Sequence, residues 1–183
     1  MEDTKTPLAH GFDVAAIRAA AANLEDGAVT QGYQADREAV IQMLNDALAT
    51  ELVCILRYKR HYYTVVGAGT GPVKAEFLEH AQQEQQHADQ IAERITQLGG
   101  APDFSPEGLA MRSHAEYVEG GSLEEMIRED LVAERIAIDS YREMINYVGN
   151  EDSTTRRMLE EILAKEEEHA DDLASLLEGI GRH

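Results

Sequence analysis

The chain has few residues of the kinds that build disulfides, iron–thiolate sites or basic nucleic-acid surfaces. Its 183 residues include one cysteine, no tryptophan and four prolines, and only 16 lysines and arginines stand against 35 aspartates and glutamates. The lone Cys54 forms no internal disulfide and excludes an iron site made of several thiolates, which fits a reducing cytoplasm. The formal charge of −19 repels nucleic acid and attracts cations, so we expect no nucleic-acid partner.

The sequence also offers no sign of export or of a membrane. No apolar stretch approaches the roughly 20 residues that span a bilayer. The first residues, from Met1 to Thr6, lack the basic and apolar regions of a signal peptide. We therefore expect a cytoplasmic protein with no membrane partner. The hydrophobic content of 43% is typical of a folded protein, and the length fits one domain with a sizeable core.

Four long helices with apolar stripes account for most of the chain. The periodicity predicts helices at about 36–66, 72–98, 122–148 and from about 153 to near the C-terminus. Short turns separate the first helix from the second and the third from the fourth, so those pairs are antiparallel neighbours. The stretch 99–121 is long enough to cross over along the bundle. Two short turns around one long crossover predict an all-α, antiparallel four-helix bundle.

A shorter segment precedes this bundle. Residues 1–12 are expected to be a loose tail, and Asp13 caps a short predicted helix that ends near Glu25. We therefore divide the chain into an N-terminal extension at 1–35 and a four-helix bundle at 36–183. We expect the extension to pack on the outside of the bundle or on a neighbouring subunit.

Two Glu-x-x-His motifs occupy the inward faces of the second and fourth long helices. Residues three apart share one face of a helix, so each motif directs a carboxylate and an imidazole to the same place. One inward glutamate also interrupts the apolar stripe of each of the other two helices. The six residues are Glu51, Glu84, His87, Glu134, Glu166 and His169.

Six ionisable groups in an apolar core need compensation, because an unpaired buried carboxylate costs several kcal/mol. Two divalent metal ions would supply it, since four carboxylates and two such ions sum to zero charge. We predict that the motif glutamates bridge the ions, that each motif histidine binds one ion, and that the two isolated glutamates are terminal ligands. Oxygen and imidazole donors without thiolate suit iron or manganese, and zinc is a further alternative.

Two polar residues are candidates for supporting this site. Tyr58 stands two turns after Glu51 on the same face. We predict that it hydrogen-bonds a ligand or is oxidised by one electron, and a plain core aromatic is the alternative. Asp130 stands one turn before Glu134, where it is either the acceptor for a ligand histidine or an exposed acid.

Four other residues are placed by helical phase alone. His80 is expected at the rim of the site. His61 is expected at the surface, with a role in guiding iron as the alternative. Tyr141 and Cys54 are expected to be core residues, the latter as an inert buried thiol.

These motifs make the chain similar to the bacterioferritins of the ferritin-like superfamily over about residues 36–178. The resemblance rests on the run from Leu44 to Glu51 with Tyr58 and His61 following, on Asp130 to Glu134, and on the two Glu-x-x-His motifs. It implies a ferritin-like bundle with an intra-subunit ferroxidase centre that binds two iron ions per subunit. It further implies oxidation of Fe(II) by dioxygen or peroxide, with the ferric product stored in a hollow homo-oligomeric shell.

The chain departs from the bacterioferritin pattern in ways that bear on haem and on assembly. Gln85 stands where bacterioferritins carry the methionine that binds haem, so we expect no haem. Gly179 and Gly181 are expected to end the fourth helix, which leaves no fifth helix of the kind found in 24-subunit ferritins. We therefore favour a Dps-like shell of twelve subunits, with a simple dimer as the alternative.

Two other functions use the same bundle. One is an enzyme with a permanent metal pair, as in manganese catalase or a rubrerythrin-like peroxidase, although rubrerythrin's partner domain needs four cysteines and this chain has one. The other is a non-redox structural shell whose site holds zinc. Iron loading separates them, because a storage protein accumulates many irons per subunit and a fixed pair stops near two.

Overall fold

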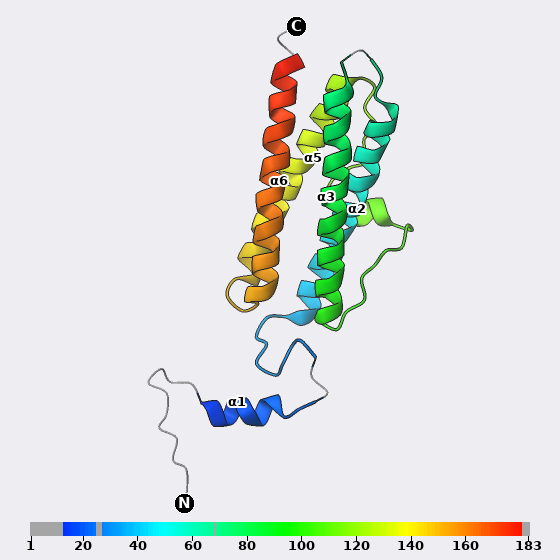
Figure 1. Cartoon of the computed structure of the whole chain (residues 1–183). Helices are drawn as coiled ribbons and strands as arrows, with labels where there is room; N and C mark the ends of the chain where they lie inside the picture. Colours follow the sequence, from blue (N-terminus) through cyan, green and yellow to red (C-terminus); the bar gives the residue numbers. More distant parts are fainter. Residues whose placement is uncertain (1–12, 25–26, 68, 181–183) are drawn as a thin grey trace, which may run out of the picture. The chain divides into compact units, whose positions relative to one another are not determined.

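In the computed structural model, residues 13–24, 27–67 and 69–180 are described, and the regular structure among them is helical. Four long helices lie side by side (Figure 1). They are α2 (Arg37–Thr64), α3 (Gly71–Gln97), α5 (Leu123–Val148) and α6 (Ser153–Ile180). Helix α2 packs chiefly against α3, and α5 against α6, with further contacts between α2 and α5 and between α3 and α6. The predicted all-α bundle with one long crossover is confirmed.

Side-chain caps begin α2 and α5 close to the predicted positions. Oδ1 of Asp36 accepts a hydrogen bond from the backbone N–H of Ala39 at 3.1 Å. Oγ of Ser122 accepts one from the N–H of Glu125 at 3.2 Å. Each cap satisfies a donor that the first turn of a helix leaves unpaired.

The described part of the last helix ends close to the predicted position. Helix α6 continues through Gly179 to Ile180, one residue beyond the first of the two glycines expected to end it. A glycine in a helix costs only about 1 kcal/mol relative to alanine, which the neighbouring residues of the helix outweigh. Gly181 lies outside the described residues.

A short helix, α1 (Val14–Ala21), precedes the bundle. Its N-cap is Asp13, whose Oδ1 accepts from the N–H of Ala16 at 2.9 Å. The helix is shorter than predicted, and both Glu25 and the expected tail at 1–12 lie outside the described residues.

The chain divides into two compact units, Met1–Tyr33 and Gln34–His183. The sequence placed this division between the ranges 1–35 and 36–183. The packing of the extension on the bundle or on a neighbouring subunit stays a prediction.

The crossover between α3 and α5 is tied to α2 by polar side chains. It contains one helical turn, α4 (Leu109–Arg112). Oδ1 of Asn45 accepts from the backbone N–H of Asp103 at 2.8 Å. Oγ1 of Thr50 accepts from the N–H of His114 at 2.9 Å. These bonds hold the crossover along the outer side of α2, as Figure 1 shows.

Helix α2 contains a longer apolar stretch than we expected from the sequence. It contains an 18-residue window of mean hydropathy 1.5, which meets the length and composition of a membrane span. In the structure 56% of that window is buried inside the protein. A core helix meets the same criterion, so the window is weak evidence for a membrane segment.

Candidate metal centre

The fold brings the six predicted ligands together inside the bundle. Each is at most 5% exposed, and their donor atoms form two overlapping groups of four in which all atoms lie within 4.8 Å of one another. Glu84 and Glu166 belong to both groups, whereas each histidine belongs to one. The complete set, contributed by α2, α3, α5 and α6, is Glu51, Glu84, His87, Glu134, Glu166 and His169.

His87 is the nitrogen donor of the first group. Its Nδ1 atom lies 2.8 Å from Oε1 of Glu166 and 3.1 Å from Oε2 of Glu84. Oε2 of Glu51 is 3.5 Å from the same nitrogen. Burial alone would lower the pKa of His87, but these neighbouring carboxylates raise it well above its ordinary value.

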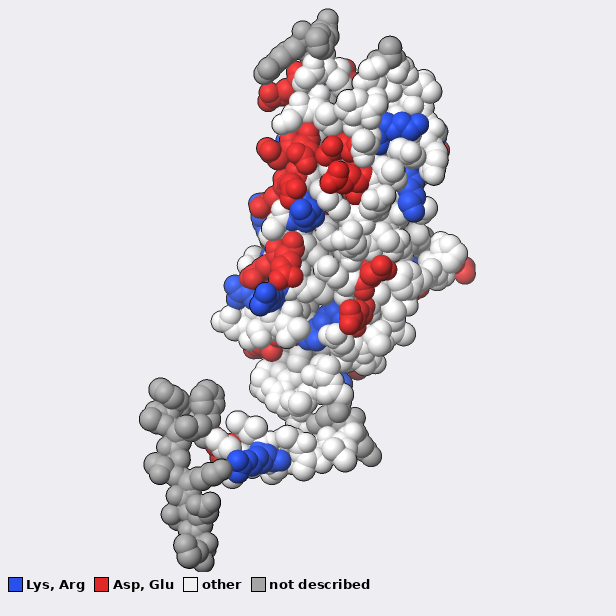
Figure 2. Space-filling model, in the orientation of Figure 1, with Lys and Arg blue, Asp and Glu red and all other residues white. Residues whose placement is uncertain are grey.

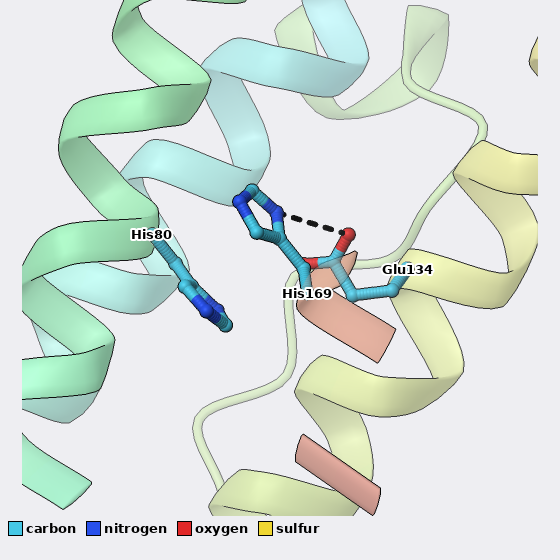
Figure 3. Close-up of side chains that lie close together, drawn as sticks. All are labelled: His80, Glu134 and His169. Atoms are coloured by element: carbon cyan, nitrogen blue, oxygen red, sulfur yellow. Dashed lines mark ion pairs between the residues drawn. The ribbon is translucent and has the colours of Figure 1, made fainter. Parts of the chain in front are cut away.

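His169 is the nitrogen donor of the second group. Its Nδ1 atom lies 3.3 Å from Oε1 of Glu84 and 3.8 Å from Oε2 of Glu134, the latter contact being drawn in Figure 3. Its Nε2 atom is 2.5 Å from Oε1 of Gln83. Because the amide oxygen only accepts, Nε2 carries a proton, and Nδ1 is the nitrogen that faces the carboxylates. Sequence reasoning did not single out Gln83.

Several buried polar atoms of the centre have no hydrogen-bond partner among the described residues. Oε1 of Glu166 is close to His87 without the alignment of a hydrogen bond. Leaving such atoms unpaired is costly, and divalent cations would satisfy them. The donor chemistry, four carboxylates and two imidazoles, fits a pair of such ions. The unpaired atoms are Oε2 of Glu51, Oε1 of Glu84, Oε2 of Glu134, Oε1 of Glu166 and Nδ1 of His169.

The four carboxylates differ in their affinity for protons. Burial, followed by the charge of Glu84, raises the pKa values of Glu51 and Glu134 well above their ordinary range. Burial would also raise those of Glu84 and Glu166, but hydrogen bonds within the site lower them. Without metal, Glu51 and Glu134 therefore hold protons more readily than Glu84 and Glu166. The carboxylates around both histidines likewise favour the charged imidazolium forms.

Two buried tyrosines hold the terminal glutamates. The hydroxyl of Tyr58 donates to Oε1 of Glu134, and that of Tyr141 donates to Oε1 of Glu51. Tyr58 thus contacts a predicted ligand, whereas its one-electron oxidation stays a prediction. Tyr141 is a core residue, as expected, but its bond to a ligand was missed.

His80 does not lie at the rim, and that expectation was wrong. It is 1% exposed, and its ring stacks on that of His169 with centroids 4.1 Å apart (Figure 3). Its Nδ1 atom lies 3.2 Å from the hydroxyl oxygen of Tyr58. Burial and the nearby His169 lower the pKa of His80 to about 3, so its imidazole is neutral.

His61 and Asp130 also differ from expectation. Asp130 is fully buried, but it accepts from Nε of Arg57 at 2.7 Å and from Nδ1 of His61 at 2.8 Å, not from a ligand histidine. His61 is fully buried by this pairing and is not a surface residue. Arg57 and His61 further contact the backbone oxygens of Glu116 and Glu119, at 3.0 and 3.1 Å. The network fastens the crossover to α2.

Solvent reaches the neighbourhood of His87 through a cavity of about 290 Å³ between α3 and α6. The surface around the bundle is acidic, and Figure 2 shows acidic side chains gathered along the α6 side of the view. The cavity is lined by Gln83, Gln86, His87, Gln90, Glu161, Ile162 and Lys165.

Two further expectations concern residues near the motifs. Cys54 is buried, as expected for an inert thiol, and burial raises its pKa well above the ordinary value. Gln85 is exposed, and its side-chain amide donates to Asp89 at 3.0 Å. The absence of haem stays a prediction.

This arrangement defines a class of protein, the four-helix bundles that enclose a carboxylate–histidine cluster. The chain matches the ferritin-like domain family over residues 41–182 and belongs to that family. Within it, the chain is of the bacterioferritin type. It is 31% identical to the bacterioferritin of Desulfovibrio desulfuricans over 154 residues, which cover 83% of this chain and 80% of that relative.

Other similar proteins include one that is named for DNA binding and one that is named as a dodecamer. A nutrient stress-induced DNA-binding protein of Synechococcus is 33% identical over 141 residues, covering 75% of this chain and 80% of the relative. Among solved structures, the dodecameric thioferritin of Bacteroides fragilis, a bacterioferritin-related protein, has a TM-score of 0.78 at 34% identity. That match covers 83% of this chain and 91% of the other.

Proposed function

We propose that this protein is a ferroxidase that binds two Fe(II) ions per subunit, oxidises them with dioxygen or peroxide, and stores the ferric product. The observation that carries the proposal is the pair of overlapping donor groups that share Glu84 and Glu166 and leave buried oxygens unpaired. Iron is both the redox centre and the substrate here, and the ion pair supplies the electrons that reduce the oxidant. Manganese and zinc are the alternatives for the same donors.

Each residue of the centre has a distinct role in this proposal. Glu84 and Glu166 bridge the two ions, and Nδ1 of each histidine binds one of them. Tyr58 and Tyr141 orient the terminal glutamates, so that one oxygen of each is committed to a tyrosine and the other is free for metal. Gln83 keeps His169 in the tautomer whose Nδ1 faces the ions.

Access and proton release follow from the same groups. The acidic surface attracts cations, and the cavity beside His87 gives them a path to the centre. Binding of divalent ions favours the loss of protons from the terminal glutamates and both histidines, whose pKa values are raised. Each proton released offsets part of the charge that the ions add, which limits the cost of burying it.

A homo-oligomeric shell in the cytoplasm is the setting that we propose. Twelve subunits are favoured, because the bacterioferritin-related relative at 34% identity is dodecameric. Nucleic acid is not part of the proposal, although one relative is named for DNA binding. The formal charge of −19 opposes contact with a phosphate backbone.

The test is anaerobic loading of the metal-free protein with Fe(II), followed by air or peroxide and optical detection of ferric species. We expect rapid oxidation of about two irons per subunit, then continued loading as mineral forms. A Glu84→Ala/Glu166→Ala variant should lose the rapid phase. Glu93→Ala/Glu167→Ala, which removes one exposed glutamate from each of the same helices, should retain it.

The alternatives give different results. Oxidation that stops near two irons would favour a fixed-pair enzyme, and zinc retention with no oxidation would favour a structural shell. Equal oxidation by the wild type and the double-alanine variant would contradict the proposed centre.

A further inference from the structure

A further group of possible ligands, separate from the two groups of the paired centre, lies on the solvent side of that centre. It consists of Glu76 and His80 on α3 and Asp172 on α6, whose donor atoms lie within 4.8 Å of one another. Nε2 of His80 is 3.2 Å from Oε1 of Glu76 and 3.9 Å from Oδ2 of Asp172. The imidazole is buried, whereas the two carboxylate side chains are 30% and 46% exposed. The group therefore connects the interior to the solvent.

The hydrogen bonds of Tyr58 determine which nitrogen of His80 carries its proton. Tyr58 has one hydroxyl proton, which it donates to Glu134. Its oxygen is then an acceptor for the Nδ1–H group of His80, 3.2 Å away. In the neutral imidazole, Nε2 is left with a lone pair. That lone pair points toward two carboxylates that, when ionised, also offer only lone pairs.

A cation resolves this excess of acceptors. One imidazole nitrogen and two carboxylate oxygens are donors that divalent iron, manganese and zinc accept, and the exposed side leaves positions for water. Burial, and then the adjacent Asp172, raise the pKa of Glu76, as expected for two carboxylates that face each other.

This group lies directly beside the paired centre. The ring of His80 stacks on the ring of His169, as Figure 3 shows, with centroids 4.1 Å apart. Glu76 and Asp172 lie beside Nε2 of His80 and are partly exposed to solvent. An ion held there would be one imidazole away from the ions of the centre.

We propose that Glu76, His80 and Asp172 form a third, mononuclear site for a divalent cation. The binding of a cation stands on this geometry alone. Its role rests on the proposed function: the site holds Fe(II) from the acidic surface before the ion moves to the paired centre.

The test counts Co(II), a spectroscopic substitute for Fe(II), bound anaerobically to the full-length, assembled, metal-free protein. We expect about three Co(II) per subunit in the wild type and about two in Glu76→Gln/Asp172→Asn, which changes only partly exposed carboxylates. The matched control is Glu79→Gln/Asp171→Asn, which alters exposed neighbours on the same helices and should still bind about three. Anomalous diffraction from Co(II)-soaked crystals should place the third ion on His80.

The outcomes separate this site from the paired centre. The Glu84→Ala/Glu166→Ala variant should retain one Co(II), and that ion should disappear when Glu76 and Asp172 are also changed. A wild type that binds only the single outer ion would contradict the paired centre and support this site. A wild type that binds only two ions, both in the paired centre, would overturn the third site. So would a Glu76→Gln/Asp172→Asn variant that binds as many ions as the wild type. For the role, we expect that variant to oxidise limiting Fe(II) several-fold more slowly than the control.

Discussion

Tyr141 on α5 donates its hydroxyl hydrogen bond to Glu51 on α2, and this bond has a counterpart across the bundle. Tyr58, seven residues after Glu51, donates to Glu134, which stands seven residues before Tyr141. Each terminal glutamate is thus held by a tyrosine that lies two helical turns after the other terminal glutamate. The two halves of the centre are built from the same pair of positions on different helices.

Removal of either tyrosine hydroxyl should weaken the centre without unfolding the bundle. Tyr58→Phe and Tyr141→Phe each leave a glutamate unoriented, and loss of such a supporting bond typically costs about 10–100-fold in metal affinity or activity. Affinity is measured by competition with a metal chelator, and activity by the rate of Fe(II) oxidation. Tyr63→Phe, at a side chain that is 76% exposed, is the control and should match the wild type. Wild-type affinity and rate in both site variants would rule out this role.

Metal loading near neutral pH should release protons. Glu51, Glu134 and both histidines have raised pKa values in the metal-free protein, and metal ions compete with protons for these groups. We expect a net release of protons on binding two divalent ions. A pH indicator in weakly buffered solution measures the release. A value near zero would show that the carboxylates and imidazoles do not bind the ions.

The stability of the metal-free protein should fall as the pH rises. Burial is the largest single effect on the pKa of His169 and lowers it, but the surrounding carboxylates together outweigh burial and raise the pKa from 6.5 to about 12. A pKa that is higher in the folded state adds stability that is complete below about 6.5 and is lost as the pH approaches 12. The melting temperature of the metal-free protein should therefore drop between about pH 7 and pH 10. The metal-loaded protein should change less, because its imidazoles are bound in their neutral form, and equal slopes for the two forms would contradict the assignment.

Removal of one partner from the buried ion pair of Arg57 and Asp130 should lower the stability of the protein. Their side chains are fully buried and 2.7 Å apart, so Asp130→Ala leaves a guanidinium uncompensated in the core. We expect the free energy of unfolding to fall by about 3–5 kcal/mol in urea denaturation. Glu124→Ala, which breaks the exposed pair with Arg128, should cost about 0–1 kcal/mol. Similar costs for the two variants would show that the Asp130 network is not structural.

The long helices and the six clustered residues were predictable because both follow from helical periodicity. Glu51 fills a gap of seven residues between Leu48 and Ile55, and only an inward position continues that stripe. Repetition of such gaps on four helices indicated a common interior site. The structure brings these residues together, which is the geometric part of the prediction.

Burial of the remaining polar residues was not predictable from one helix at a time. His61 and Asp130 are 69 residues apart in the sequence, and the partner that makes each tolerable in the core lies on another helix. His80 was misplaced for the same reason, since its neighbours are Tyr58 and His169. For Tyr141 a signal did exist, because it repeats the seven-residue spacing of Glu51 and Tyr58.

Crystals of the metal-free protein soaked anaerobically with Fe(II) provide the most direct measurement, by anomalous diffraction at the iron edge. We predict two iron peaks inside the bundle, both contacted by Glu84 and Glu166, one bound by Nδ1 of His87 and the other by Nδ1 of His169. Iron found only at the protein surface, or no ordered iron between these four residues, would contradict the proposed centre.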